Sequence, residues 1–166
     1  VEVIVYCDYK NEFCKNYLET VNKVIDAFKE NVVVAFRHFI LGSSSHSTES
    51  ALASECASEQ GKFLEMHDEL FENYVDSPID EQYLKIAQKI KLNKTSFDSC
   101  MKSRKFEDRI LAQISEGEKF GVLGTPSTFI NGEKLPGAYG FEDFVDSNNK
   151  RREGIRSVVE RYLNNE

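Results

Sequence analysis

The first forty residues of the chain contain two apolar runs on either side of an amphipathic segment. Residues 1–6 and 32–36 are rich in β-branched and aromatic side chains, which is typical of buried strands. Between them, residues 12–30 repeat apolar side chains at the spacing of a helix. Two strands joined by such a long crossover form a right-handed parallel unit. The chain is therefore predicted to begin with a β-α-β unit.

A Ser-rich break at residues 42–47 ends this unit, and the pattern then becomes helical. The predicted helices cover residues 47–60, 62–74, 80–90, 94–103 and 104–120. This order predicts a block of helices inserted after the second strand.

The pattern returns to strands after Pro126. Residues 127–130 and 133–135 flank Asn131-Gly132, a pair that favours a two-residue hairpin turn. Residues 141–147 and 152–163 are predicted to close the chain as two further helices.

Composition limits the classes of function. A chain of 166 residues and 19.0 kDa is long enough for one domain. No apolar run approaches the length of a membrane span, so we expect a soluble chain. A net charge of -7 argues against a nucleic-acid partner. The basic cluster Lys150, Arg151 and Arg152 is predicted to be the solvated start of a helix.

Residues 6–15, Tyr-Cys-Asp-Tyr-Lys-Asn-Glu-Phe-Cys-Lys, resemble the active-site segment of the DsbA family of thiol-disulfide oxidoreductases, in which a Cys-x-x-Cys motif opens a helix. Further stretches similar to the family run along the chain: residues 36–39, 51–57, 59–63, 66–68, 70–71, 97–100 and 121–132. The resemblance implies an α/β thioredoxin fold with an inserted all-helical domain. The thioredoxin-fold parts are expected at about residues 1–41 and 121–166, and the insert at about 42–120.

The motif departs from the family at its first cysteine. Cys14 aligns with the second cysteine of the family, which places Asn11 at the position of the attacking thiol. Asparagine forms no thiolate, the species that attacks in thiol-disulfide exchange. Asn11 is instead suited to cap the helix. Cys14 lies in the first helical turn, where a thiolate is favoured; the alternative is a shielded, unreactive thiol.

Cys7 stands at the end of the first strand, which in this fold approaches the start of the helix. Two interpretations remain open: a substitute pair with Cys14, or a small buried apolar side chain. Thiolates of Cys7 and Cys14 are also candidate ligands for a soft metal, copper or zinc. The three histidines, His38, His46 and His67, lack the spacing of a zinc site and are interpreted as structural.

Two further features depend on the resemblance. Thr125-Pro126 is similar to the cis-proline loop of the family, which presents backbone groups to a substrate peptide. Cys56 and Cys100 stand where family members often carry a second, structural disulfide; two separate buried thiols are the alternative. Such a disulfide favours an extracytoplasmic location: periplasmic, secreted or membrane-anchored.

The sequence thus predicts a DsbA-like oxidoreductase or isomerase with an atypical active site, acting on protein thiols or disulfides without a required cofactor. A peptide-binding protein without exchange activity and a copper- or zinc-binding protein are the alternatives. The expected partners are proteins or peptides with Cys residues. A membrane-bound redox partner is left open.

Overall fold

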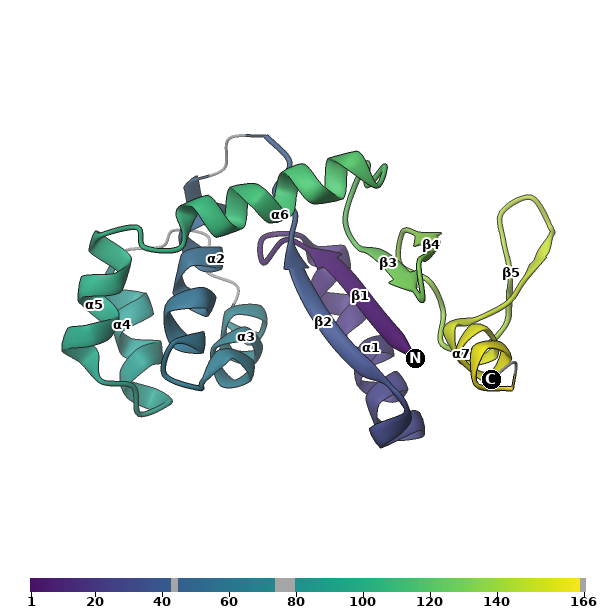
Figure 1. Ribbon diagram of the computed structural model, residues 1–166, viewed down its shortest axis with the longest axis horizontal. Coiled ribbons are helices and arrows are strands. Elements are labelled where there is room, and N and C mark those ends of the chain that lie inside the picture. The colour runs from purple at the N-terminus through teal and green to yellow at the C-terminus, as the bar shows by residue number, and fades with distance from the viewer. Residues whose placement is uncertain (43–44, 74–79, 165–166) are drawn as a thin grey trace.

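A mixed sheet organises the computed structural model, which describes residues 1–42, 45–73 and 80–164. Its strands are ordered β2-β1-β3-β4, with β1 parallel to β2 and antiparallel to β3, and β4 antiparallel to β3 (Figure 1). The bounds are β1 (Glu2–Cys7), β2 (Val33–His38), β3 (Ser127–Ile130) and β4 (Glu133–Pro136). The predicted β-α-β unit and hairpin are both present.

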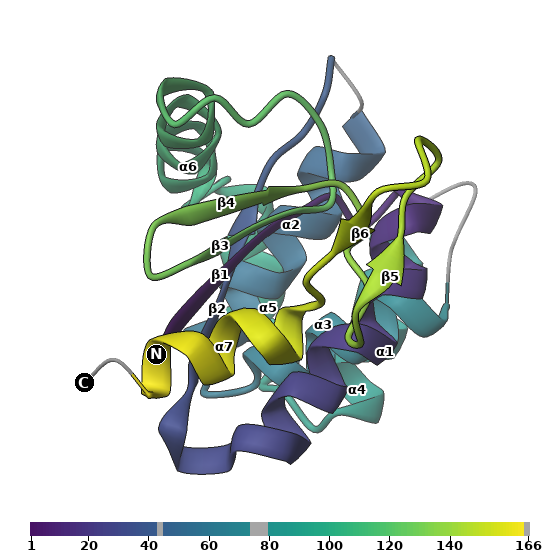
Figure 2. The same ribbon diagram turned by 90° about the vertical axis from the view of Figure 1, so that its right-hand side faces the viewer.

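The register of β1 and β2 decides what each face of the sheet presents. Cys7 pairs with His38, so these two side chains share the face that α1 (Glu12–Phe28) covers. Tyr6 points to the opposite face, where it packs with Phe39 and Val122 next to α6 (Glu107–Lys119). Figure 2 shows α1 and α6 on opposite sides of the sheet. The carboxyl end of β1 therefore meets both the start of α1 and the end of β2.

Five helices lie between β2 and β3 in the described part of the chain. In chain order they are α2 (Ser45–Ser58), α3 (Phe63–Glu72), α4 (Asp80–Lys89), α5 (Lys94–Lys102) and α6. The central helix, α2, is buried along most of its length because its small side chains let α3 and α5 approach closely. The fold is thus a thioredoxin fold with an inserted helical region, as predicted. The predicted end of α3 at Tyr74 lies outside the described residues.

The helix predicted over residues 141–147 is wrong. Phe144 and Val145 form β5 (Phe144–Val145), which pairs with β6 (Arg151–Arg152). Asp146 closes the turn between them, because its Oδ1 accepts hydrogen bonds from the backbone N–H groups of Asn148 and Lys150 at 2.9 and 3.0 Å.

The last helix, α7 (Ile155–Leu163), begins three residues after the predicted start. Arg151 and Arg152 of the basic cluster therefore lie in a strand rather than at a helix start, and they form ion pairs with Asp143 and Asp146, respectively. Gly154 precedes the helix because a Cβ there would lie only 2.3 Å from the backbone of Glu142.

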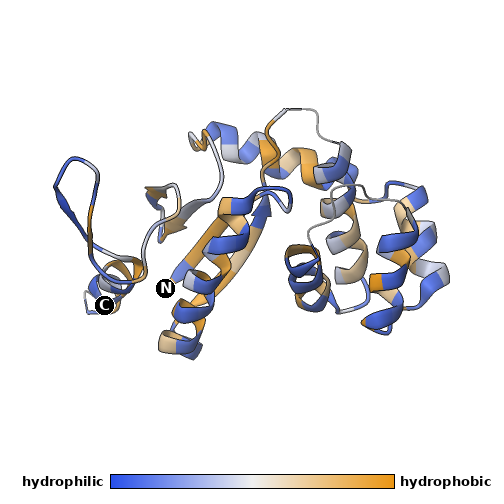
Figure 3. Ribbon diagram, turned by 180° about the vertical axis from the view of Figure 1, so that it is seen from behind, coloured by the Kyte–Doolittle hydropathy of each residue, from blue (hydrophilic) through white to orange (hydrophobic). Residues whose placement is uncertain are grey.

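Apolar residues lie on the strands of the sheet, as the orange segments of Figure 3 show, and the buried ones also come from α1, the inserted helices and α7. Across residues 1–42, 45–73 and 80–164, no helix has both the length and the apolar character needed to cross a membrane.

Candidate functional site

A disulfide joins the end of β1 to the first turn of α1. It links Cys7 and Cys14, whose Cα atoms are 5.8 Å apart, within the range that disulfides require. Both residues are buried, with exposed fractions of 8% for Cys7 and 0% for Cys14. The pairing left open by the sequence is therefore the state of this structure, and neither sulfur is present as a free thiol.

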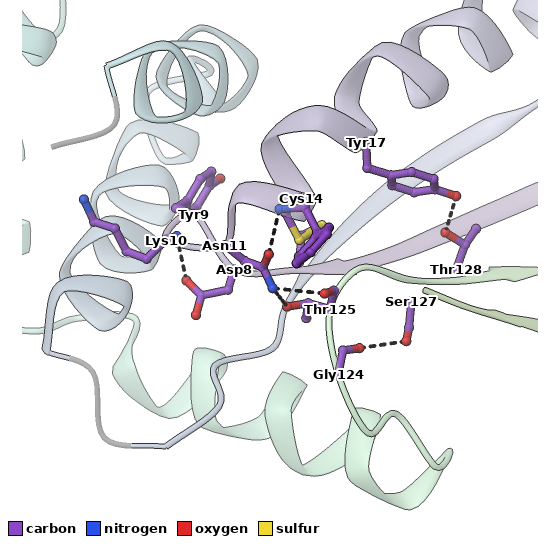
Figure 4. The surroundings of a disulfide bond; sticks show 12 residues. Asp8, Tyr9, Lys10, Asn11, Cys14, Tyr17, Gly124, Thr125, Ser127 and Thr128 are labelled. Atoms are coloured by element: carbon purple, nitrogen blue, oxygen red, sulfur yellow. Dashed lines mark hydrogen bonds between the residues drawn. A yellow bond between two sulfur atoms is a disulfide. The ribbon is translucent and has the colours of Figure 1, made fainter. Parts of the chain in front are cut away.

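Asn11 caps α1 and at the same time contacts a distant loop. Its Oδ1 accepts from the backbone N–H of Phe13 at 2.8 Å, which is the expected cap. Its Nδ2 donates to the backbone oxygen of Thr125 at 3.0 Å and to the Thr125 hydroxyl at 2.8 Å (Figure 4). The second contact was not foreseen, because 114 residues separate the partners.

The loop that Asn11 reaches contains the cis peptide bond Thr125-Pro126. The Ser127 hydroxyl donates to the backbone oxygen of Gly124 at 2.8 Å across this turn. A second hydrogen bond of α1 lies one turn beyond Cys14, where the hydroxyl groups of Tyr17 and Thr128 are 2.8 Å apart (Figure 4). The helix is therefore hydrogen-bonded to β3 as well as to the loop. Burial raises the pKa of Tyr17 to about 12, an effect that the Thr128 hydrogen bond opposes.

Two large apolar side chains near this loop remain in solvent. Phe13, in the first turn of α1, is 67% exposed, and Leu123, two residues before Thr125, is 87% exposed. Both side chains therefore contribute exposed apolar surface at this end of the molecule.

Behind the disulfide lies a buried polar group that the sequence did not reveal. His38 Nε2 is 3.3 Å from Oε1 of Glu55, whose other oxygen is 3.3 Å from Nη1 of Arg109. Burial raises the pKa of Glu55, but the hydrogen bond and charge of His38, with Arg109 and Gln113, outweigh it, so the pKa lies below its usual value. A glutamate within a helix gives no sign of burial in the sequence. The burial of Glu55 is evident only from the packing in the folded structure.

The other disulfide lies in the inserted helices, away from this site. It joins Cys56 of α2 to Cys100 of α5, with Cα atoms 5.9 Å apart and a sequence separation of 44. The expected pairing of these two residues is therefore present in the structure. Among the residues that the structure describes, no group of three or more His, Cys, Asp or Glu side chains is arranged to hold a metal ion.

Comparison with protein families identifies one match along most of the chain. The family model described as thioredoxin matches residues 1–148. Two longer relatives match as well: a Na(+)/H(+) antiporter NhaA 1 of Mycobacterium sp. strain KMS, 30% identical over 82% of this chain, and a Na(+)/H(+) antiporter NhaA 3 of Salinispora tropica, 29% identical over 86%. The chain spans 23% and 22% of their lengths, about a quarter of each antiporter.

Solved structures with the same fold cover nearly the whole chain. BdbD from Bacillus subtilis, in its oxidised form, superimposes with a TM-score of 0.79 at 20% identity, covering 98% of this chain and 87% of that one. A thioredoxin-like oxidoreductase from Silicibacter pomeroyi gives 0.76 at 24% identity, over 98% and 86% of the two chains. A periplasmic thioredoxin-like protein from Salmonella enterica gives 0.70 at 21%, over 98% and 84%. At these identities the similarity establishes the fold.

Proposed function

Because the chain belongs to the thioredoxin family, we propose that it is a thiol-disulfide oxidoreductase whose reactive pair is Cys7 and Cys14. The observation that carries the proposal is the position of this disulfide. It lies at the N-terminus of α1, beside the loop with the cis bond Thr125-Pro126. This position supports Cys7–Cys14 as the reactive pair even though position 11 carries Asn.

The proposed exchange uses the asymmetry between the two cysteines. A substrate thiolate attacks the sulfur of Cys7, which retains 8% exposure, and Cys14 leaves as a thiolate. The helix N-terminus stabilises the negative charge on Cys14. A second substrate thiol, once deprotonated, attacks the substrate sulfur of the mixed disulfide and releases Cys7. The substrate gains a disulfide, and the pair ends as two thiols.

The proposed substrates are proteins or peptides with Cys residues, docked along the cis-proline loop. Phe13 and Leu123 offer apolar contacts there. Two disulfides in one chain support an extracytoplasmic location. A membrane-bound redox partner remains part of the proposal. A copper- or zinc-binding protein is an alternative function, in which reduced Cys7 and Cys14 would bind the ion as thiolates; metal analysis of the reduced protein tests it.

The test is the oxidation of a reduced model peptide by the oxidised protein, with Cys7→Ser and Cys14→Ser as variants. Loss of activity in both variants is expected for a reactive pair. The double variant Cys56→Ala/Cys100→Ala is the control, and it should retain the unmodified rate. Oxidation retained in either single variant would show that the activity does not use this disulfide and would contradict the pair.

A second function is favoured by one observation: both cysteines are buried, with exposed fractions of 8% for Cys7 and 0% for Cys14. A chain of this kind could hold a peptide without exchanging disulfides. If the unmodified protein binds a Cys-free peptide but leaves the reduced peptide unoxidised, this second function replaces the first.

A further inference from the structure

His67, on α3, carries a buried nitrogen without a hydrogen-bond partner. The residue is 3% exposed. Its Nδ1 lies 2.9 Å from the Tyr9 hydroxyl, whereas its Nε2 is unpaired among the described residues. The imidazole packs against four aromatic rings: Tyr9, Phe36, Phe63 and Phe71. Because buried polar atoms are nearly always paired in native proteins, this nitrogen needs a partner from another state or molecule.

A small cavity lies beside this imidazole and reaches Cys7. Its lining includes Cys7, His38 and His67, and its volume is about 10 Å³. Phe36, on the same face of β2 as His38, packs against His67 with ring centroids 4.1 Å apart and the ring planes tilted by 48°, which holds the imidazole against the sheet. A volume of this size accommodates about one water-sized group. The cavity therefore gives room for one small polar group near both Cys7 and His67.

We propose that His67 Nε2 is the internal hydrogen-bond partner of the Cys7 sulfur once the Cys7–Cys14 bond is reduced. The inference rests on the proposed function, because it requires a redox change at this pair. Two glutathione molecules convert the disulfide into two protein thiols and release one glutathione disulfide. In the oxidised protein the bond to Cys14 holds the Cys7 sulfur. Breaking that bond lets the side chain adopt another rotamer that places its sulfur in the cavity.

The imidazole is suited to this contact in either tautomer. Burial, and secondarily the charge of His38, lowers the pKa of His67 to about 3, so the ring is neutral. If Nδ1 accepts from Tyr9, Nε2–H donates to a Cys7 thiolate; if Nδ1–H donates to Tyr9, Nε2 accepts the proton of a Cys7 thiol. Both arrangements give the reduced state a hydrogen bond that the oxidised state lacks. The contact thus favours reduction of the pair.

The variant His67→Phe removes both nitrogens and keeps an aromatic ring at this position. The equilibrium of the Cys7–Cys14 pair with glutathione is followed by thiol alkylation and peptide mass spectrometry, which separates this pair from Cys56–Cys100. We expect the equilibrium constant for reduction to fall about tenfold, equivalent to a potential about 30 mV more negative. A structural cost shared by both redox states cancels in this equilibrium.

Two controls separate the Nε2 contact from general damage. Tyr9→Phe removes the partner of Nδ1 and leaves Nε2 in place, and His46→Phe changes an exposed residue of α2. Both should leave the equilibrium within about twofold of the unmodified protein. Nitrogen-15 NMR of the unmodified protein adds a test that needs no variant, because the Nε2 resonance of His67 should shift on reduction.

The outcomes distinguish this inference from the function on which it rests. If a phosphine reductant fails to open Cys7–Cys14 in the folded protein, both are overturned. If the pair opens but His67→Phe changes the equilibrium by less than twofold, or the Nε2 resonance stays in place, this inference alone fails.

Discussion

The Asn11 amide connects the start of α1 to the cis-proline loop through Thr125. Its nitrogen donates to the Thr125 backbone oxygen at 3.0 Å and to the hydroxyl at 2.8 Å, while its oxygen caps the helix. Position 11 is where the resemblance to the DsbA family places the attacking thiol. A side chain that cannot exchange disulfides therefore connects α1 to the loop along which we propose that substrates dock.

The variant Asn11→Ala is expected to lower the free energy of unfolding by about 2 kcal/mol, since it loses a helix cap and two bonds to Thr125. It should also speed the reduction of Cys7–Cys14 by dithiothreitol, because the loop is no longer fastened to the helix. Urea unfolding and timed alkylation measure the two effects.

The matched control for this prediction is Asn93→Ala. Asn93 caps α5 by accepting from the Ser96 N–H at 3.0 Å, and its side chain lies outside the reactive site. This variant should cost about 1 kcal/mol and leave the reduction rate unchanged. Equal reduction rates in both variants would show that the Thr125 contact does not protect the disulfide.

The two disulfides should differ in their contribution to stability. Their sequence separations are 44 for Cys56–Cys100 and 7 for Cys7–Cys14. In the chain-entropy model these loops correspond to about 4 and about 2.5 kcal/mol. Cys56→Ala/Cys100→Ala should therefore lower the free energy of unfolding more than Cys7→Ala/Cys14→Ala, as measured by urea unfolding. The reverse order would mean that native-state packing at the reactive pair outweighs the loop entropy.

The order of the long elements could be predicted from the sequence because they repeat apolar residues with a clear period, and the resemblance to the DsbA family then indicated the fold. The β-α-β unit and the order of the inserted helices follow from the periodic patterns, and the hairpin follows from the Asn131-Gly132 turn. The β5–β6 hairpin could not be predicted, because a strand of two residues has no period. Its turn depends on the side chain of Asp146, which accepts from two backbone N–H groups.

The site was predicted only in part. The resemblance indicated Cys14 and the Thr125-Pro126 loop, and the pairing of Cys7 stayed open because it depends on a distance in the folded chain. The contact of Asn11 with Thr125 and the burial of Glu55 beside His38 depend on packing between remote segments. No local pattern encodes either.

Stability should depend on pH through His67. Burial, with the nearby His38 charge, lowers its pKa from 6.5 to about 3, so between these values the unfolded chain binds a proton that the folded chain does not. The free energy of unfolding therefore falls as the pH drops from about 6.5 toward 3, by up to about 1.4 kcal/mol per pH unit from this residue. Urea unfolding at pH 7, 5 and 4 measures the slope.

The variant His67→Phe should flatten this slope between pH 6.5 and 4.5, whereas His46→Phe, which changes an exposed residue, should keep it. Glu55 affects the free energy of unfolding at lower pH. Because its pKa is lowered in the folded protein, its contribution to stability is complete above about pH 4.5 and is lost as the pH falls below that value. An unchanged slope in His67→Phe would show that the imidazole is charged in the folded protein.

The variant Asn11→Cys tests whether the missing thiol limits oxidation. A thiol at position 11 would stand at the N-cap of α1, at the Cys-x-x-Cys spacing from Cys14, where the helix N-terminus favours the thiolate. Adding Cys7→Ser prevents the original pair from competing. We expect this double variant to oxidise a reduced peptide at least ten times faster than the unmodified protein.

The control Lys10→Cys/Cys7→Ser adds a thiol one residue earlier, outside that spacing, and should give no such gain. An equal gain in the two double variants would mean that an added thiol at either position suffices. No gain in either would mean that the Cys7–Cys14 pair of the unmodified protein oxidises the peptide at least as fast as the new pair.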